Sequence, residues 1–511
     1  MRRHASKTRI RDGTRGLTVL SRGIYNVGRF SRKEVLKKTM NKKLLLAIIG
    51  CVVMTACSLL SPDAQSVLQS SQKAMGSVKS IQYSGTGMNA FFGQALTAGK
   101  EWPRRPLTSY TRTINYDQKS GSEDMMFANP VFGGQHQNTE VSGDKAWTVG
   151  PNGPAPQMAQ AEARQLQIWL TPHGFVKGAL DSGNATLKKD GANVVTFTAL
   201  GKYKVSGTID SQNMVTKVET TVADPVLGDL PIVTNYSDYK DFNGVKFPTK
   251  IVQTQGEFPV WELTITSVQP NAPAELPVPE VVQSASIPPV KVETTKLSDG
   301  VWFLGGGSHH SLVVEFKDYI AVIEGPLNEA RSKAVMEEAK KLVPNKPIKY
   351  LLSTHHHFDH SGGLRTYVAE GVTIVTHQSN VPYFEKTFQA PATISPDAQA
   401  KNPKPGTFQG VTDKYVLSDG TQTIEAYATQ GDMHTDELLV FYLPKPKILV
   451  EADSYSPGPP NTPPPSPVPP NAVTLYNNIQ RLKLNVATIA PIHGRGPVPM
   501  SEFMKFIAKR S

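Results

Sequence analysis

Histidine and aspartate are concentrated in one short segment, residues 355–360, with the order His-Xaa-His-Xaa-Asp-His. An apolar strand leads into this segment, and alternate side chains of a strand share a face, so His355 and His357 can converge on one cation. Asp359 and His360 follow the end of the strand, where two glycines permit a turn into the next helix. One loop can thus supply ligands to two neighbouring metal sites.

This motif resembles that of the metallo-β-lactamase superfamily, and the resemblance covers about residues 292–500. That family folds as a four-layer αβ/βα sandwich, with its metals at one edge of the two sheets. Its pattern continues with a histidine, then an acidic residue after an apolar strand, then a last histidine. The matching residues here, each at the end of an apolar run, are His434, Asp453 and His493. The resemblance therefore predicts an α/β fold of this type.

The resemblance also implies how the ligands divide between two metals. The first site would consist of His355, His357 and His434. The second would consist of Asp359, His360 and His493, with Asp453 bridging. Histidine nitrogen and carboxylate oxygen suit zinc, and iron or manganese can occupy the same donor set. The prediction is two Zn²⁺ per chain.

The chain departs from the family pattern at two points. The usual Asp-Thr-Gly after the second strand is replaced by Ile323-Glu324-Gly325, which gives Glu324 a supporting role and not a ligand role. Ser454 directly follows Asp453, and some lactamases with a serine near this point leave the bridging position to water. The two cysteines, at positions 51 and 57, precede this region, which excludes the cysteine-ligated subclass.

Other polar residues near the motif are predicted to lie outside the ligand set. We expect His309 and His310 to form a surface turn, with substrate contact as the alternative. His356 points away from its neighbours on the strand and is expected to pack beside the ligands, whereas His377 lies outside the site. Asp436 could brace a ligand ring, because metal-bound histidines commonly have a carboxylate partner.

The implied chemistry is hydrolysis. Two metals about 3.5–4 Å apart lower the pKa of a shared water toward about 7, which yields a hydroxide that attacks an acyl carbon. Asp359 is the predicted catalytic residue, since it would orient this hydroxide as well as bind metal. The favoured substrate is a small amide or ester ring, such as a β-lactam or lactone. The alternatives are another lipid- or peptide-derived ester, or a non-catalytic envelope binding protein that keeps its metal for structure.

The residue pattern of the chain differs between its N-terminal and C-terminal parts. Residues 58–268 alternate short β-rich runs with turn signals, among them Asn243-Gly244, which predicts an antiparallel β-rich domain. This domain carries no catalytic constellation and is expected to be a spacer or a pocket cover, although it loosely resembles the acyl-holding half-barrels of lipoprotein carriers. Residues 269–291 read as a proline-rich linker, and residues 292–511 as the catalytic domain.

A second proline-rich segment lies just past Asp453. Residues 456–470 contain nine prolines, which predicts a stiff, extended segment. It can be either a wall of the substrate pocket or a solvent-exposed spacer.

The N-terminal residues predict targeting. Residues 40–57 combine Lys42-Lys43, ten apolar residues and Ala56-Cys57, which resembles the signal peptide and lipobox of bacterial lipoproteins. Residues 1–39 then read as a misassigned upstream start. We expect a periplasmic lipoprotein anchored in the membrane through Cys57, with the outer membrane favoured because Ser58 is not aspartate. Ordinary cleavage to a secreted protein is the alternative.

Charge argues against a nucleic-acid partner. The formal net charge is +11, but the first 43 residues alone carry 14 basic and two acidic side chains. The remainder is therefore close to neutral and offers no basic surface for a polyanion. We expect a small-molecule substrate. The sequence does not indicate an oligomeric state.

Overall fold

The computed structural model describes residues 62–508, apart from 130–133, 190 and 464. The predicted upstream start, signal peptide and lipid anchor therefore lie outside the described residues. The described residues all belong to one compact unit. Among the described helices, none is both long enough and apolar enough to cross a membrane.

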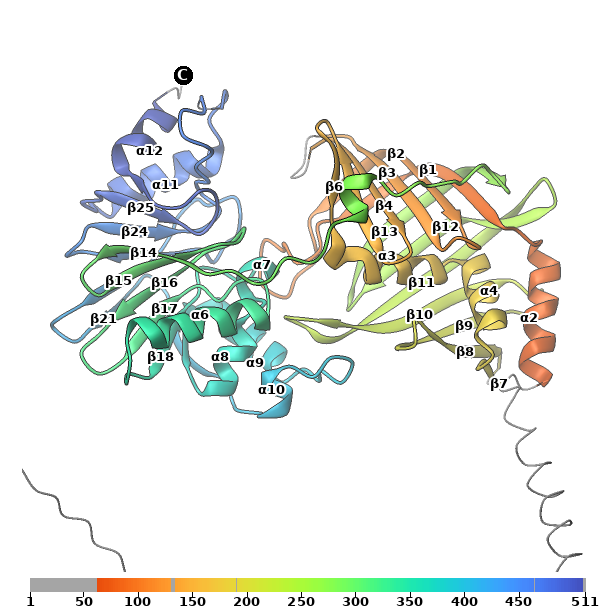
Figure 1. The fold of residues 1–511 in the computed structure, drawn as a ribbon, viewed down its shortest axis with the longest axis horizontal. Coiled ribbons are helices and arrows are strands. Elements are labelled where there is room, and N and C mark those ends of the chain that lie inside the picture. Colours follow the sequence, from red (N-terminus) through yellow and green to blue (C-terminus); the bar gives the residue numbers. More distant parts are fainter. Residues whose placement is uncertain (1–61, 130–133, 190, 464, 509–511) are drawn as a thin grey trace, which may run out of the picture. The chain divides into compact units, whose positions relative to one another are not determined.

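The first part of this unit, called here the β region (residues 62–270), is one antiparallel sheet of 13 strands (Figure 1). The strand order is β6-β5-β4-β3-β2-β1-β13-β12-β11-β10-β9-β8-β7, so that all neighbours except β1 and β13 are consecutive in the chain. The strands are β1 (Ser80–Ala90), β2 (Arg104–Asn115), β3 (Ser120–Phe127), β4 (His136–Ser142), β5 (Lys145–Gly150), β6 (Gly153–Pro156), β7 (Thr186–Lys189), β8 (Asn193–Ala199), β9 (Tyr203–Ile209), β10 (Val215–Asp224), β11 (Gly228–Phe242), β12 (Val245–Gln255) and β13 (Phe258–Pro270).

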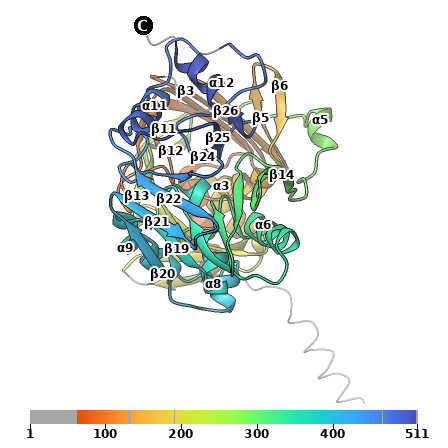
Figure 2. The same ribbon diagram turned by 90° about the vertical axis from the view of Figure 1, so that its left-hand side faces the viewer.

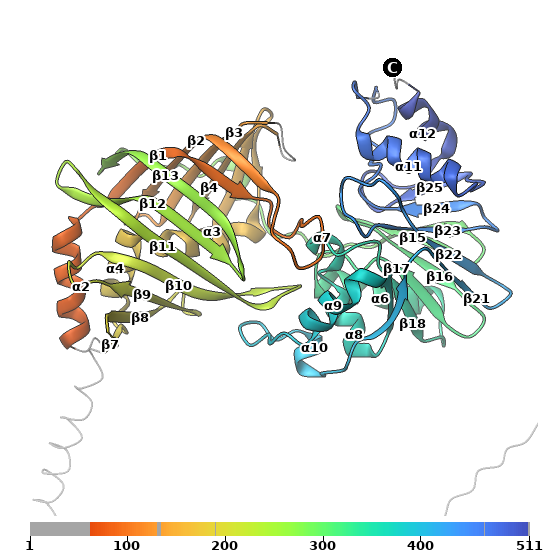
Figure 3. The same cartoon turned by 180° about the vertical axis from the view of Figure 1, so that it is seen from behind.

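Alternating burial and tight turns explain this meander. Along β11, buried residues alternate with partly exposed or exposed ones over most of its length, as expected for a sheet with one wet face. Asn243 and Gly244 join β11 to β12 and both have positive φ, at 55° and 83°, which matches the predicted hairpin. The helices α3 (Ala161–Trp169) and α4 (Pro172–Ser182) supply Leu166 and Phe175 to the core beneath the sheet (Figure 3).

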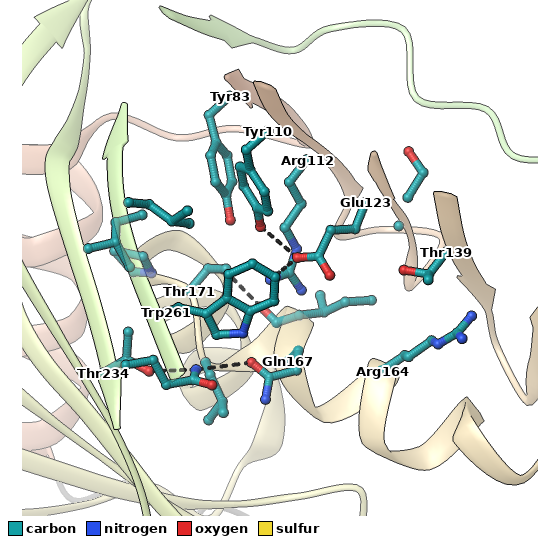
Figure 4. A pocket seen from close by; sticks show the side chains of 18 of the residues that line it. Tyr83, Tyr110, Arg112, Glu123, Thr139, Arg164, Gln167, Thr171, Thr234 and Trp261 are labelled. Atoms are coloured by element: carbon teal, nitrogen blue, oxygen red, sulfur yellow. Dashed lines mark hydrogen bonds and ion pairs between the residues drawn. The ribbon is translucent and has the colours of Figure 1, made fainter. Parts of the chain in front are cut away.

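The β region also contains a cavity of about 150 Å³ between its strands and α3 (Figure 4). Tyr110 Oη donates to Glu123 Oε1 at 2.6 Å, and Arg112 Nη1 lies 3.7 Å from the same oxygen. Gln253 Nε2 donates to both Thr234 Oγ1 and Gln167 Oε1, at 2.9 and 3.2 Å. Apolar side chains, among them Ile251, Trp261 and Leu263, line the rest of the cavity, so its lining combines apolar surface with a few paired polar groups.

The predicted linker continues directly from β13 (Figure 1). It contains one short helix, α5 (Glu280–Gln283), and lies against the β region. In the linker, Ala272 O accepts a hydrogen bond from Ser80 Oγ at 2.6 Å, and Ala285 O accepts one from Lys145 Nζ at 3.4 Å. These contacts tie the linker to β1 and β5.

The second part, called here the sandwich region (residues 293–508), has four layers (Figure 2). One sheet has seven strands: β14 (Glu293–Ser298), β15 (Val301–Gly305), β16 (Ser311–Glu315), β17 (Ile320–Ile323), β18 (Ile348–Leu352), β19 (Thr373–His377) and β20 (Thr407–Val411). The other has six: β21 (Lys414–Ser418), β22 (Thr423–Ala428), β23 (Leu439–Leu443), β24 (Ile448–Glu451), β25 (Thr488–Pro491) and β26 (Val498–Pro499).

The apolar side chains fall into three layers that hold this sandwich together. One cluster, including Phe303 and Phe441, fills the space between the two sheets. A second packs α6 (Glu329–Leu342), α8 (Leu364–Glu370) and α9 (Val381–Phe388) on the seven-stranded sheet. A third packs α11 (Pro470–Arg481) and α12 (Met500–Ile507) on the six-stranded sheet. The predicted fold class, an αβ/βα sandwich preceded by an antiparallel β-rich domain, is confirmed.

Candidate metal centre

The candidate ligands follow the ends of strands that lie inside the two sheets. His355 and His357 come after β18, which pairs in parallel with β17, and Asp359 and His360 lie in the short helix α7 (Phe358–Ser361). Asp453 follows β24 and His493 follows β25, and these two strands are also parallel neighbours. Because parallel strands end at the same edge of a sheet, their following loops deliver these side chains to one place.

The structure brings the seven predicted ligands into two clusters that share Asp453. In the first cluster, His357 Nδ1 lies 2.9 Å from His434 Nε2, with His355 beside them. In the second cluster, His360 Nε2 lies 2.9 Å from His493 Nε2, with Asp359 nearby. Asp453 Oδ2 lies 2.8 Å from His360 Nε2 and 3.6 Å from both His355 Nε2 and His434 Nε2. Its carboxylate therefore contacts both clusters, as a bridging ligand must.

One unpartnered atom shows that this arrangement fits a metal. His355 Nε2 is buried and has no hydrogen-bond partner among the described residues. A buried polar atom without a partner costs about 1–3 kcal/mol, so such atoms require an explanation. A cation among the imidazole nitrogens and carboxylate oxygens supplies one, and this donor set suits zinc, iron or manganese.

Burial prepares the histidines of the first cluster for a metal. Burial holds the pKa of His355 well below its ordinary value and lowers the pKa of His357 to about 3, with the neighbouring His434 adding to the effect. Both rings are therefore neutral at physiological pH, and a neutral imidazole binds a metal without first losing a proton.

The carboxylates are held in the charged form. Burial alone would raise the pKa of Asp453, but His360 and His493 hold it well below its ordinary value. The pKa of Asp359 is likewise lowered, because the hydrogen bond to His309 and the nearby His360 outweigh burial. The centre thus presents two anions against a set of neutral and cationic rings.

Glu324 takes the supporting role that the sequence predicts. It lies directly after β17, is fully buried, and its Oε1 accepts a hydrogen bond from Thr354 N at 2.6 Å. Its Oε2 lies 2.7 Å from His360 Nδ1, which leaves His360 Nε2 facing the ligand cluster. Although burial favours a neutral His360, Asp453 and Glu324 together raise its pKa well above the ordinary value. Such outer partners fix the ring orientation of a metal-bound histidine.

The prediction of a surface turn at His309 and His310 is wrong. Both residues are buried, because the segment pairs with the chain around His493. His309 Nε2 lies 3.1 Å from Asp359 Oδ2 and its ring belongs to the second cluster, as a fourth candidate ligand. His310 Nε2 instead donates to Gly494 O at 2.8 Å.

Three further side chains can be placed. His356 lies beside the ligands and its Nε2 donates to Ala95 O at 2.9 Å, while His377 bonds Ser379 away from the centre. Asp436 does not brace a ligand ring in the described contacts, since its Oδ2 accepts from Thr97 Oγ1 at 2.8 Å. Asp432 Oδ1 accepts a hydrogen bond from the backbone N–H of His434 at 2.9 Å.

The proline-rich segment contributes to a hollow that reaches the metal centre. This hollow has a volume of about 880 Å³, and its lining includes Asp453, Tyr455, Pro459, Pro463 and Phe506. The segment thus lines a space beside the bridging carboxylate, which favours the pocket wall over the exposed spacer.

Sequence reasoning missed the contribution of the β region to this centre. The loop between β1 and β2 places Gln94 Nε2 2.7 Å from Asp359 Oδ1 and Ala95 O 2.9 Å from His357 Nε2. These residues lie about 260 positions before their partners, and no local motif marks them.

A four-layer αβ/βα sandwich with two histidine–aspartate clusters at the ends of its strands defines the metallo-β-lactamase class of folds. Residues 304–493 match the family model of the metallo-beta-lactamase superfamily, which confirms the resemblance for this segment. No curated protein matches the chain.

Several solved structures are similar to part of the chain. A metallo-beta-lactamase from Pontibacter korlensis is 21% identical and covers 43% of this chain and 99% of its own, with a TM-score of 0.32. One from Hirschia baltica is 19% identical and covers 43% and 97%, with a TM-score of 0.32. The metallo-beta-lactamase FIM-1 from Pseudomonas aeruginosa, in its mono-zinc form, is 18% identical and covers 43% and 95%, with a TM-score of 0.32.

Proposed function

We propose that the protein is a dinuclear metal-dependent hydrolase, with zinc as the favoured metal, that opens a small amide or ester ring such as a β-lactam or lactone. The observation that carries this proposal is the position of the Asp453 carboxylate, which contacts both histidine clusters: His355 and His434 of the first, and His360 and His493 of the second. Bound there, a metal pair would lower the pKa of water toward neutrality and polarise a carbonyl oxygen.

The chain's own residues supply the rest of the chemistry. Asp359, held anionic by its histidine neighbours, is placed to accept a proton from a water and to orient it toward an acyl carbon. The hollow of about 880 Å³ beside Asp453 falls within the range of small-molecule sites, and its proline wall gives it a stiff boundary. A small ring with one reactive carbonyl fits such a space better than a polymer does.

Metal analysis and a substrate panel test the proposal together. Purified full-length protein should contain close to two equivalents of metal. It should also turn over at least one of a chromogenic cephalosporin, a homoserine lactone and a p-nitrophenyl ester, and a chelator should abolish this activity. Asp359→Asn should reduce turnover by about 10²-fold or more, whereas Asp299→Asn, at an exposed position, should not.

Each outcome separates the alternatives. A metal content near zero after growth in zinc would rule out the dinuclear centre. Turnover of the p-nitrophenyl ester alone would favour a lipid- or peptide-derived ester over a strained ring. A fully metallated protein without turnover on the whole panel would favour a binding protein that uses its metal for structure.

We also propose that the protein is a lipoprotein of the bacterial cell envelope, anchored through Cys57 and facing the periplasm. The basic pair, apolar core and Ala56-Cys57 support this, and a multiply acylated cysteine anchors stably, at about 0.8 kcal/mol per buried methylene. Cys57→Ser should release the protein from membranes or stall its processing, while Cys51→Ser should do neither. Membrane fractionation identical for both variants and wild type would leave simple secretion.

A further inference from the structure

The β1–β2 loop, residues 91–103, leaves the β region and reaches the metal centre. A backbone hydrogen bond from Phe91 N to Pro103 O, at 2.8 Å, closes the loop at its base. We propose that this loop completes the metal centre, with Gln94 positioning Asp359 and the Ala95 carbonyl positioning His357. The inference rests on the proposed metal centre and goes beyond it, because it assigns part of that centre to the β region.

The Ala95 carbonyl decides which nitrogen of His357 is free for a metal. His357 Nε2 lies 2.9 Å from Ala95 O. A carbonyl oxygen can only accept, so Nε2 carries the hydrogen and Nδ1 keeps its lone pair. That lone pair is directed at the first cluster, since Nδ1 lies 2.9 Å from His434 Nε2.

Gln94 holds the carboxylate of Asp359 in the same manner. Its side-chain amide nitrogen lies 2.7 Å from Asp359 Oδ1, and His309 Nε2 lies 3.1 Å from Oδ2. A carboxylate only accepts, so the amide NH₂ group of Gln94 must face it. Because glutamine is neutral, it orients Asp359 without adding a charge that competes with the metal.

The loop is attached to the sandwich region by further hydrogen bonds, so its position is not that of a free segment. Leu96 O accepts from Asp436 N and from Thr435 Oγ1, both at 3.0 Å. Thr97 Oγ1 donates to Asp436 Oδ2 at 2.8 Å. These partners directly follow His434, so the loop is tied down beside the first cluster.

Apolar packing anchors the loop beside the second cluster. The rings of Phe92 and Trp102 pack edge-on against Phe358, with centroid distances of 5.3 and 5.5 Å, and Phe358 immediately precedes Asp359. Gly93 has a φ of +80°, and a Cβ on it would lie 2.8 Å from the Phe358 ring. Only glycine therefore allows this approach without displacement.

The test is site-resolved metal affinity of the full-length protein. Gln94→Leu removes the donor to Asp359 but leaves the first cluster untouched. Competition titrations with a chromogenic chelator, using zinc and cobalt, should show the affinity for one equivalent lowered about 10–100-fold and the other unchanged. Glu101→Gln, at an exposed position in the same loop, is the matched control and should retain both affinities within about twofold.

The outcomes separate this inference from the proposed function. Two equivalents bound with wild-type affinity by Gln94→Leu would overturn the positioning role. An equal loss at both sites in Gln94→Leu would also overturn it, because a loop that only supports the fold predicts that result. Circular dichroism checks folding, and Gln94→Met replaces Gln94→Leu if the latter unfolds. Absence of metal from wild-type protein would instead refute the proposed function.

Discussion

At the residue scale, burial decides the charge of the groups that matter most. His355 and His357 are neutral because burial lowers their pKa, while Asp359 and Asp453 stay anionic because histidines surround them. This combination favours a divalent cation over a proton at neutral pH. The supporting residue Glu324 belongs to the same scheme, because its carboxylate accepts from a backbone N–H and from His360 at the same time.

Glu324→Gln tests this double role. An amide has one accepting atom, so it cannot accept from both Thr354 N and His360 Nδ1, and the His360 ring loses its orientation. We expect the affinity for one metal equivalent to fall about 10–100-fold in a chelator competition titration. Glu262→Gln, a surface pair partner of Arg104, should bind both equivalents like wild type. Unchanged affinity in Glu324→Gln would refute the role.

His173 makes a separate contribution to the pH dependence of stability. Burial in α4 against Phe247 lowers its pKa to about 4, from an ordinary value of 6.5. Below about pH 6.5, His173 therefore binds a proton in the unfolded chain, whereas in the folded protein it stays neutral until the pH falls to about 4. The stability from this neutral ring is complete above pH 6.5, decreases as the pH falls, and stops decreasing below about pH 4.

Urea unfolding at pH 7 and pH 5 measures this effect. The loss of unfolding free energy between the two values should be about 2 kcal/mol smaller in His173→Phe than in wild type. Equal pH dependence in wild type and His173→Phe would show that this ring does not titrate as proposed.

At the element scale, α6 does more than cover the seven-stranded sheet. Arg331 on this helix is buried, and its guanidinium donates to Leu304 O and Gly305 O at 2.9 Å and to Lys291 O at 2.6 Å. Leu304 and Gly305 end β15 and lead toward His309, whose carbonyl oxygen also accepts from Arg331 at 3.4 Å, whereas Lys291 lies just before β14. The helix therefore holds the segment that presents a candidate ligand of the second cluster.

Replacing Arg331 tests this arrangement. Arg331→Met removes the charged donor to the carbonyl oxygens of Leu304, Gly305 and His309, whose hydrogen bonds are buried, so we expect the free energy of unfolding to fall by about 2–4 kcal/mol. Lys333→Met, on the exposed face of the same helix, should change it by less than about 0.5 kcal/mol. Denaturant titrations followed by circular dichroism distinguish the two, and a similar small change for both would contradict the prediction.

At the scale of the whole molecule, the metal centre links distant parts of the chain. Its ligands and their partners come from the β1–β2 loop, from both sheets of the sandwich region and from the segment after β25. A ligand that binds only the folded state stabilises it, by about 2.7 kcal/mol at a hundredfold excess over its dissociation constant. The metal should therefore act on global stability as well as on chemistry.

Metal removal measures this coupling. Chelator treatment should lower the melting temperature by several degrees, and zinc should restore it. In Asp453→Ala, which lacks the bridging carboxylate, the restoration by zinc should be much smaller. Scanning calorimetry of both proteins, with and without zinc, provides the comparison. A melting temperature of wild type that does not respond to zinc would show that the metal is not bound by the folded protein.

The sequence alone determined the features that depend on local pattern. The His-Xaa-His-Xaa-Asp-His spacing after an apolar strand, with histidine and aspartate at the ends of later strands, was sufficient to predict the sandwich fold and the seven residues that the structure brings together. Likewise, Asn243-Gly244 sufficed for a hairpin, because a type I′ turn demands these residues whatever surrounds them.

Only the tertiary structure decided which residues far apart in the chain meet. His309 is buried at the second cluster because its segment pairs with the chain near His493, and Gln94 reaches Asp359 because a loop of another sheet crosses to it. Neither residue carries a local signal, since a histidine in a glycine-rich turn and a glutamine in a loop are ordinary surface residues. Their roles arise from contacts between chain segments that no spacing along the sequence encodes.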